Sequence, residues 1–305
     1  MARLIEILEV GPRDGLQNEP GVLPTATKVE LIERMIAAGL RHIEVASFVN
    51  PARVPQMADA EAVFKSLPRQ EGVRFVGLVL NRRGFDRAVA AGCDEVGMAV
   101  VASDTFNRRN QGASTAESIA AWHDIAAAAR AAGIRAQITI SAVCGCPFEG
   151  EVPVARVVDI AREVAKSAPS EIALADTIGV GVPAQVTELV RQVRAAVPST
   201  PLRGHFHNTR NTGLANAYAA VEAGVRMLDA SLGGIGGCPF APAATGNIPT
   251  EDLVYMLQRS GFETGISLEA LIDTSKWLQE QLGRPVPGML VKAGVFPGTA
   301  GQGLR

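Results

Sequence analysis

Short apolar runs alternate with longer amphipathic stretches along nearly the whole chain. The short runs are rich in Val, Ile and Leu, as buried strands are, and the longer stretches are rich in Ala and have a helical period. The expected strands are Leu4–Val10, His42–Ala46, Arg74–Leu80, Glu95–Ala99, Arg135–Ile140, Glu171–Ala175, Leu202–Phe206 and Met227–Ser231. The expected helices between them are Thr25–Ala38, Ala52–Ser66, Gly84–Ala91, Ala116–Ala132, Val154–Ser167, Ala184–Ala196 and Thr212–Ala223.

This alternation predicts an α/β fold of the (β/α)₈ TIM-barrel type, since eight expected strands are each followed by a helix or a further segment. Several helical stretches end at a glycine shortly before the next strand, as in Ala38-Gly39 and Ala132-Gly133, which is typical of a helix C-cap. The alternative is a doubly wound sheet, in which the strand order reverses midway. Strand order is not visible in a sequence, so the count of eight is what favours the barrel.

The region after the eighth expected strand differs in composition. A glycine-rich stretch covers residues 233–246, and two further helices are expected at Thr250–Arg259 and Leu268–Leu282. Residues 283–305 contain Gly and Pro and have a weak period. We expect one domain, 1–305, with the barrel at about 3–247 and additional C-terminal helices at about 248–305, because no linker or low-complexity tract divides the sequence.

Composition and charge exclude several classes of protein. The 305 residues are 47% hydrophobic and 20% charged, which argues against a disordered chain or a collagen. Lys and Arg number 29 against 31 Asp and Glu, so no basic surplus suggests nucleic-acid binding. Glu6 and Glu9 argue against a secretory signal, and no apolar run approaches the ~20 residues of a membrane span. We therefore expect a cytoplasmic protein, with its four cysteines reduced.

A barrel places its functional residues just after the strand ends, on one face. The notable polar residues are at such positions: Arg13 and Asp14 follow the first expected strand, Glu44 lies near the end of the second, Asp176 follows the sixth, and His205-Phe206-His207 ends the seventh. We expect these side chains to converge in space.

His205-Phe206-His207 is the strongest single signal. Alternate residues of a strand point the same way, so both imidazoles face one side, which is the arrangement that binds a divalent transition ion. The alternative is a pair of hydrogen-bonded structural histidines. Asp14 across the barrel mouth would add a carboxylate, and one neutral oxygen would complete a partly filled octahedral site with open positions for a substrate.

Arg13 next to Asp14 has two interpretations. The pair is either an ordinary salt-bridged turn, or a metal ligand beside a guanidinium that stabilises a developing oxyanion. The run Gly233-Gly234-Ile235-Gly236-Gly237-Cys238 suggests a mobile lid or a backbone that must approach a ligand closely. Cys238 at its tip could transfer a proton over the barrel mouth, although an isolated cysteine is more often a small buried hydrophobe.

The other cysteines and the basic pairs are weaker signals. Cys144-Gly145-Cys146 has poor disulfide geometry, so we expect core or loop packing for it, and core packing for Cys93. Arg82-Arg83 and Arg108-Arg109 are expected in loops, as solvated charge or as contacts to ligand phosphates.

Several long blocks resemble the 3-hydroxy-3-methylglutaryl-CoA lyase family, over roughly residues 3–282. The blocks are Gly11-Pro-Arg-Asp-Gly-Leu-Gln-Asn-Glu19, Ile43-Glu-Val-Ala-Ser-Phe-Val49, Gly145-Cys-Pro-Phe-Glu-Gly150, Asp176-Thr-Ile-Gly-Val-Gly181 and Gly236-Gly-Cys-Pro-Phe-Ala241 with Thr250-Glu-Asp-Leu-Val-Tyr-Met256. Isopropylmalate synthase-like enzymes share the first motif and the paired histidines, but the cysteine-loop block separates this chain from them.

The resemblance implies a barrel lyase with a Mg²⁺ or Mn²⁺ cofactor that cleaves an acyl-CoA by a retro-Claisen reaction. It implies the metal ligands Asp14, His205, His207 and Asn247. It implies catalytic roles for Arg13 on the enolate, Cys238 as its proton donor, His205 or Asp14 as base, and Glu44 and Asp176 as tuning residues. Arg13, Gln17, Asn110 and Arg210 would contact the substrate, and Glu251 would lie behind the cysteine loop. Two imidazoles would favour Mn²⁺ over Mg²⁺.

Departures from the family pattern leave the acyl group open. Asn208-Thr-Arg-Asn211 stands where the family often has Asp-Thr-Tyr-Gly or Asp-Thr-Arg-Gly, and Ala173 and Ala175 replace the common Ser and Gly. The first hypothesis is cleavage of hydroxymethylglutaryl-CoA, and the second is cleavage of a related thioester such as citramalyl-CoA. A third is a non-catalytic barrel that binds a metal or CoA, which the complete set of site residues disfavours. We expect a homo-oligomer that binds a small acyl-CoA, and neither nucleic acid nor a membrane.

Overall fold

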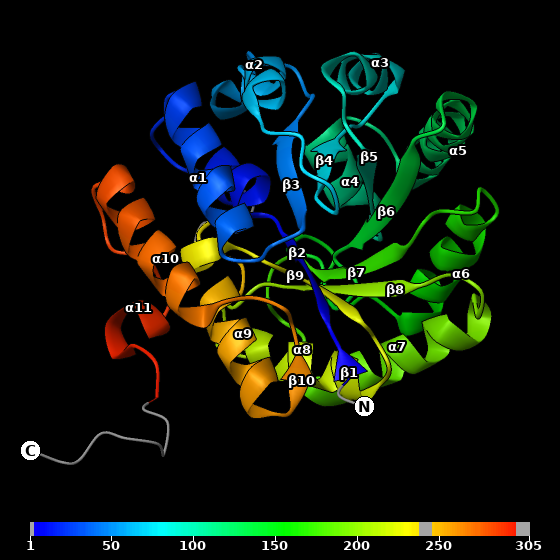
Figure 1. Ribbon diagram of the computed structural model, residues 1–305. Helices are drawn as coiled ribbons and strands as arrows, with labels where there is room; N and C mark the ends of the chain where they lie inside the picture. The colour runs from blue at the N-terminus through cyan, green and yellow to red at the C-terminus, as the bar shows by residue number, and fades with distance from the viewer. Residues whose placement is uncertain (1–2, 238–245, 297–305) are drawn as a thin grey trace, which may run out of the picture.

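Eight parallel strands close into a barrel in the computed structural model, which describes residues 3–237 and 246–296 (Figure 1). Each strand pairs with its neighbours in the chain, and the last pairs with the first, so the predicted (β/α)₈ TIM barrel is confirmed and the doubly wound sheet is excluded. The strands are β2 (Glu6–Glu9), β3 (His42–Ser47), β4 (Arg74–Leu78), β5 (Glu95–Val101), β6 (Arg135–Ser141), β7 (Ile172–Asp176), β8 (Leu202–Phe206) and β9 (Met227–Ala230).

The amphipathic stretches form the outer ring of helices, because each has an apolar stripe that packs on the outward side chains of the strands. Most agree with the predicted ranges to within a few residues, and Gly133 ends its helix in the left-handed conformation, at φ 68°, as its predicted cap role requires. The helices are α1 (Thr25–Ala37), α2 (Ala60–Ser66), α3 (Arg82–Ala91), α5 (Thr115–Ala132), α6 (Val154–Ala165), α7 (Pro183–Ala196), α8 (Gly213–Glu222), α9 (Thr250–Arg259), α10 (Leu268–Leu282) and α11 (Leu290–Ala293).

Two predictions about the loops were wrong. The helix expected from Ala52 begins only at Ala60, after a short 3₁₀ turn at Pro55–Met57, because a proline disfavours helical backbone at the residue before it. A further helix, α4 (Asp104–Gln111), was not expected at all. It is short and polar, with only Phe106 and Asn107 buried, so it has no apolar period by which to recognise it.

The two basic pairs consequently lie on helices and not in loops. Arg82 and Arg83 begin α3, whose first turn is capped by the side-chain oxygen of Asn81 accepting from the Gly84 N–H at 2.9 Å. Arg108 and Arg109 are in the last turn of α4, where a positive charge is favourable next to the helix C-terminus. The Asn81 cap therefore explains why α3 begins at Arg82, and the helix dipole explains why Arg108 and Arg109 are favourable at the end of α4.

The C-terminal helices pack onto the barrel. Figure 1 shows α10 alongside α1, and Arg34 of α1 stacks over the ring of Trp277 of α10 at 4.7 Å. The short strands β1 (Arg3–Leu4) and β10 (Phe262–Glu263) form a separate parallel pair. Since Leu271 and Leu278 of α10 belong to the same hydrophobic core as the barrel, we propose that residues 1–305 form one domain.

The three described cysteines, Cys93, Cys144 and Cys146, are buried free thiols, as predicted. Cys238 lies outside the described residues. Among the helices that the structure describes, none combines the length and apolar character needed to cross a membrane.

Candidate active site

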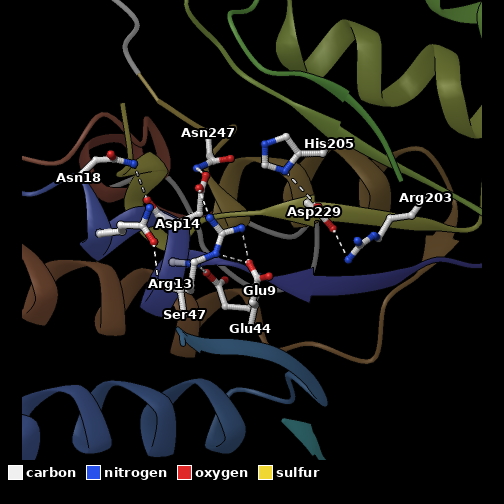
Figure 2. Close-up of polar contacts among 12 residues, drawn as sticks. Glu9, Arg13, Asp14, Asn18, Glu44, Ser47, Arg203, His205, Asp229 and Asn247 are labelled. Atoms are coloured by element: carbon white, nitrogen blue, oxygen red, sulfur yellow. Dashed lines mark hydrogen bonds and ion pairs between the residues drawn. The ribbon is translucent and has the colours of Figure 1, made fainter. Parts of the chain in front are cut away.

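The polar cluster at the carboxyl end of the barrel begins with a tight turn after β2. Residues Gly11–Gly15 form one turn of π-helix, in which the Val10 carbonyl accepts the N–H groups of Arg13, Asp14 and Gly15 at 3.2, 2.7 and 3.2 Å. π-turns of this kind recur at functional sites, since they redirect side chains over a short distance. The turn directs Arg13 and Asp14 over the mouth of the barrel (Figure 2).

Asp14, His205 and His207 come together as a three-residue cluster. Each offers one ligand atom, and these atoms all lie within 4.8 Å of one another. His205 is in β8 and His207 follows it by two residues, so the alternation of the strand puts both rings on one side, with centroids 5.2 Å apart. In the described residues this is the one group of His, Cys, Asp and Glu side chains close enough to hold a metal ion.

The pKa shifts of Asp14 and His207 suit a divalent cation. For His205, burial lowers the pKa, but the hydrogen bond and charge of Asp229 on β9 outweigh it and raise the pKa. Burial alone would raise the pKa of Asp14, but the charges of Arg13 and the two histidines lower it to about 2, so the carboxylate is ionised at neutral pH. Burial and the neighbouring His205 lower the pKa of His207 to about 3, so its imidazole is neutral. A carboxylate and a neutral imidazole are the forms that ligate a metal.

Asn247 lies beside Asp14. Its amide nitrogen donates to Asp14 Oδ2 at 2.8 Å and to the Ile235 carbonyl at 3.3 Å. His207 pairs with Asn247 in an isolated antiparallel β-bridge, which brings the segment after the glycine-rich loop to the end of β8. The predicted ligand Asn247 is therefore next to the cluster, and a ligand role for its amide oxygen stays a prediction.

Arg13 is held between two carboxylates. Its Nη1 lies 2.6 Å from Asp14 Oδ1, and its Nε donates to Glu44 Oε2 at 2.7 Å (Figure 2). Burial raises the pKa of Glu44, and the charge of Arg13 offsets this only in part. The contacts on both sides fix the plane of the guanidinium, as a preorganised donor to a developing oxyanion requires.

Asp229, in β9, was not predicted from the sequence as a site residue. Its Oδ2 lies 3.0 Å from His205 Nδ1, so the carboxylate accepts the Nδ1–H and leaves Nε2 free to face the cluster. Metal-binding histidines commonly hold such a carboxylate on their second nitrogen. The sequence did contain a signal that could have indicated it. Asp229 is an acidic residue within the predicted strand Met227–Ser231, and buried strands seldom contain acidic residues.

A pocket of about 980 Å³ opens beside the cluster. Arg13, Asp14, Glu44, His205 and His207 line it. Two predicted substrate-contact residues line it as well. Gln17, which accepts a hydrogen bond from Ser47 Oγ at 3.1 Å, is one, and Asn110 of the unexpected helix α4 is the other.

Neither Asp176 nor Arg210 is among the described residues that line the pocket, although the Asp176 carbonyl accepts the His207 N–H at 3.3 Å. Their predicted roles stay predictions. The Asp176 carboxylate is buried, which raises its pKa, and accepts the backbone N–H groups of Val180 at 3.1 Å and Gly181 at 2.8 Å. Arg210 is exposed and donates to the carbonyls of residues 178 and 179. Both side chains hold the loop after β7.

The described part of the glycine-rich loop packs tightly against the cluster. Gly236 has φ 100°, and a Cβ there would meet the Asp14 carbonyl oxygen at 2.8 Å and Asn247 Nδ2 at 2.9 Å, so only glycine fits. The sequence suggested that this backbone approaches a ligand closely. In the structure the backbone at Gly236 lies close to Asp14 and Asn247. Glu251 is buried behind this loop, and its Oε2 accepts the Gly233 N–H at 3.0 Å.

Comparison with known proteins places this geometry in a family. The sequence is 48% identical to (R)-citramalyl-CoA lyase of Chloroflexus aurantiacus over 96% of each chain. It is 43% identical to hydroxymethylglutaryl-CoA lyase of Pseudomonas mevalonii, over 92% of this chain and 93% of that one. The crystal structure of an HMG-CoA lyase from Acinetobacter baumannii in complex with coenzyme A and 3-methylmalate superimposes with a TM-score of 0.93 at 40% identity, covering 99% and 98% of the two chains.

These relatives are named as lyases and share the whole length of the barrel, so the chain is a carbon–carbon lyase of this type. The profile of the HMGL-like family matches residues 4–278. The chain thus belongs to the HMGL-like family, with the HMG-CoA lyases as its relatives.

Proposed function

We propose that this protein cleaves a 3-hydroxyacyl-CoA bearing a carboxylate, by a retro-Claisen reaction that depends on a divalent cation. The observation that carries the proposal is the convergence of Asp14, His205 and His207 within 4.8 Å, beside the fixed guanidinium of Arg13. Asp14, His205, His207 and Asn247 would hold Mg²⁺ or Mn²⁺. When bound, the cation supplies Lewis-acid polarisation that acidifies the substrate hydroxyl and fixes the bond to be broken.

The chain's own residues supply the proton transfers and the charge stabilisation. Of the two expected bases, Asp14 is the one that removes the hydroxyl proton, because Asp229 and the cation would occupy both nitrogens of His205. The carbinol carbon becomes a carbonyl, and the bond to the α-carbon of the thioester breaks. The electron pair of that bond forms the enolate of acetyl-CoA, whose oxygen is stabilised by Arg13, itself positioned by Glu44. The thiol of Cys238 protonates the α-carbon, and the proton held by the base returns to the thiolate through solvent.

The pocket suits an extended acyl-CoA because its lining includes Gln17, and Arg109 and Asn110 of α4, in addition to the cluster. Gln17 and Asn110 are the proposed substrate contacts on its wall. Arg210, which holds the loop after β7 together with Asp176, would act on the substrate from the rim. The Acinetobacter relative was crystallised with coenzyme A, which supports this class of ligand.

Hydroxymethylglutaryl-CoA is the first candidate substrate, on the resemblance of the motifs and the 43% identity to the Pseudomonas enzyme. Citramalyl-CoA is the second, and two observations favour it. The identity to the citramalyl-CoA lyase is 48%, and the relative crystallised with 3-methylmalate accepts a ligand whose hydroxyl lies next to a carboxylate, as in citramalyl-CoA. The two substrates differ by one methylene, which a pocket discriminates by about 1–3 kcal/mol.

The test is a comparison of both thioesters with the purified protein and Mn²⁺, in which acetyl-CoA and the keto product are quantified together. Cleavage of hydroxymethylglutaryl-CoA to acetoacetate at the higher kcat/KM would establish the first candidate. Cleavage of (R)-citramalyl-CoA to pyruvate at the higher kcat/KM would establish the second and leave the roles of Arg13 and Asp14 unchanged. Release of acetyl-CoA from neither thioester would contradict both candidates.

A further inference from the structure

A row of alternating charges runs down the barrel interior below the metal-binding cluster. Arg203 Nε lies 3.2 Å from Glu171 Oε1, and Arg203 Nη1 lies 3.2 Å from Asp229 Oδ1. Asp229 then reaches His205 Nδ1 through its other oxygen, at 3.0 Å (Figure 2). All four side chains are buried, and Arg203 is only 3% exposed.

The positions of these residues follow from the strands. Arg203 and His205 are two residues apart on β8, so their side chains point to the same interior, and the pairing of Arg203 with Met227 puts Asp229 one strand away. A barrel interior is usually filled by branched apolar side chains. A buried guanidinium and two buried carboxylates are costly there unless they are paired, so their presence calls for a reason beyond packing.

The row fixes the orientation of one site histidine. Asp229 accepts the Nδ1–H of His205, which leaves the lone pair of Nε2 for the cluster with Asp14 and His207. Asp229 can hold the ring only if its own carboxylate is held. Arg203 does this by its charge from the opposite side, because its planar guanidinium lies 3.2 Å from both Glu171 and Asp229. These contacts are ion pairs without hydrogen-bond geometry.

We propose that Arg203 is a positioning residue, which acts through Asp229 to aim His205 at a divalent cation. The inference rests on the metal site of the proposed function. Arg203 also lines the pocket, but direct binding of a substrate carboxylate is disfavoured because Glu171 and Asp229 already flank the guanidinium. Substrate binding by Arg203 is therefore an alternative outcome of the test.

The test measures metal affinity apart from turnover. Metal-stripped wild type, Arg203→Met, Arg203→Lys, Asp229→Asn and the Arg203→Met/Asp229→Asn double variant are titrated with Mn²⁺, and free Mn²⁺ is followed by electron paramagnetic resonance. Arg203→Met is expected to weaken Mn²⁺ binding about 10–100-fold, the effect typical of residues that orient a metal ligand. Arg203→Lys is expected to weaken it by at least about 5-fold, since a single ammonium cannot span two carboxylates.

Because Arg203 acts through Asp229, the double variant is expected to bind Mn²⁺ no more weakly than Asp229→Asn alone. At saturating Mn²⁺ the KM for the acyl-CoA is expected to stay within about 2-fold of wild type. The control is Arg135→Met, since Arg135 pairs with Glu95 at 3.6 Å, is half exposed and does not touch His205 or Asp229 in the described structure. It is expected to leave Mn²⁺ affinity unchanged.

Wild-type Mn²⁺ affinity in a folded Arg203→Met protein would overturn the inference, and so would a raised KM with unchanged Mn²⁺ affinity, which would make Arg203 a substrate contact. If Arg203→Met does not fold, Arg203→Lys decides, and wild-type affinity in that variant overturns the inference. Failure of the wild type to bind Mn²⁺ would overturn the proposed metal site and the inference together. Equal Mn²⁺ affinity in wild type and Arg203→Met would overturn the inference about Arg203 and leave the proposed metal site unchanged.

Discussion

Glu44 Oε2 lies 2.7 Å from Arg13 Nε and 2.6 Å from Arg13 Nη2, so one carboxylate oxygen takes both donors on that edge of the guanidinium. The Nη1 of the same group contacts Asp14, which is also a proposed metal ligand. Arg13 is therefore fixed between the residue that would bind the cation and a residue on the next strand. The guanidinium is thus held in place by the chain itself, as the proposed stabilisation of an enolate requires.

Glu44→Gln is expected to lower kcat about 10-fold with little change in KM. The amide oxygen can still accept a hydrogen bond but has no charge, and a charge-assisted hydrogen bond is worth roughly 1 kcal/mol more than a neutral one. Steady-state kinetics at saturating Mn²⁺ measures this. Glu30→Gln is the control, because Glu30 pairs with Arg34 on the exposed face of α1. An unchanged kcat in Glu44→Gln would show that the negative charge of Glu44 is not required to position Arg13.

Cys238→Ala is expected to lower kcat by at least about 100-fold and to leave Mn²⁺ affinity unchanged, because the thiol is proposed to donate a proton and not to bind the cation. Single-turnover kinetics together with Mn²⁺ titration separates the two effects. Cys93→Ala is the control, since Cys93 is buried between the barrel and its helices, and burial raises the pKa of its thiol well above the usual value. Turnover at the wild-type rate in Cys238→Ala would refute the role of this thiol.

Glu251 makes the free energy of unfolding depend on pH. Burial raises its pKa from 4.5 to about 8, and the hydrogen bond from the Gly233 N–H offsets this only in part. The folded protein therefore binds more protons than the unfolded chain between about pH 4.5 and 8, and its stability falls as pH rises through that range. The size of the effect at pH 9 is on the order of 4 kcal/mol.

Glu251→Gln is expected to flatten that decline, because the amide does not ionise. Urea unfolding of both proteins at pH 5.5, 7 and 9 measures the difference. Glu9, whose burial raises its pKa to about 7, is present in both proteins and adds a pH-dependent contribution to each, although its charge also acts on Glu251. Parallel stability curves for the two proteins would contradict the assignment.

Trp122→Phe is expected to destabilise the fold by about 2–3 kcal/mol without changing activity. The indole is fully buried and its Nε1–H donates to the Val164 carbonyl at 2.9 Å. The change removes one of the hydrogen bonds to this carbonyl, which also accepts the Ser167 N–H at 3.3 Å, and leaves a small cavity. Tyr218→Phe, on the exposed side of α8, is the control and is expected to change stability by less than about 0.5 kcal/mol. Equal melting temperatures for Trp122→Phe and wild type would contradict this estimate.

The sequence predicted the barrel well because its strands are buried runs with clear ends. All eight predicted strands overlap strands of the barrel, and the strand His42–Ala46 was only one residue short. Helix α4 was missed because it is polar and short. The helix predicted at Ala52–Ser66 ends where predicted, but its start was wrong, because Pro55 disfavours helical backbone at the residue before it. The pattern of apolar positions does not show this local effect.

The site was predicted where residue type and strand periodicity sufficed, as for Asp14 and the two histidines. Asp229 and Arg203 were missed because their contacts depend on which strands are neighbours in the closed barrel. Asp176 was grouped with the site because it follows a strand end, yet its carboxylate binds the backbone of its own loop. The position of a residue at a strand end predicts where its backbone lies, but it does not predict whether its side chain points into the barrel mouth.

The most direct test of the central claim is a Mn²⁺ titration of the metal-stripped protein in which acetyl-CoA release and bound Mn²⁺ are followed together. The account predicts that stripping abolishes cleavage, that activity returns in proportion to bound Mn²⁺, and that Asp14→Asn loses both. Cleavage at the full rate by the stripped protein, or wild-type activity in Asp14→Asn, would contradict it.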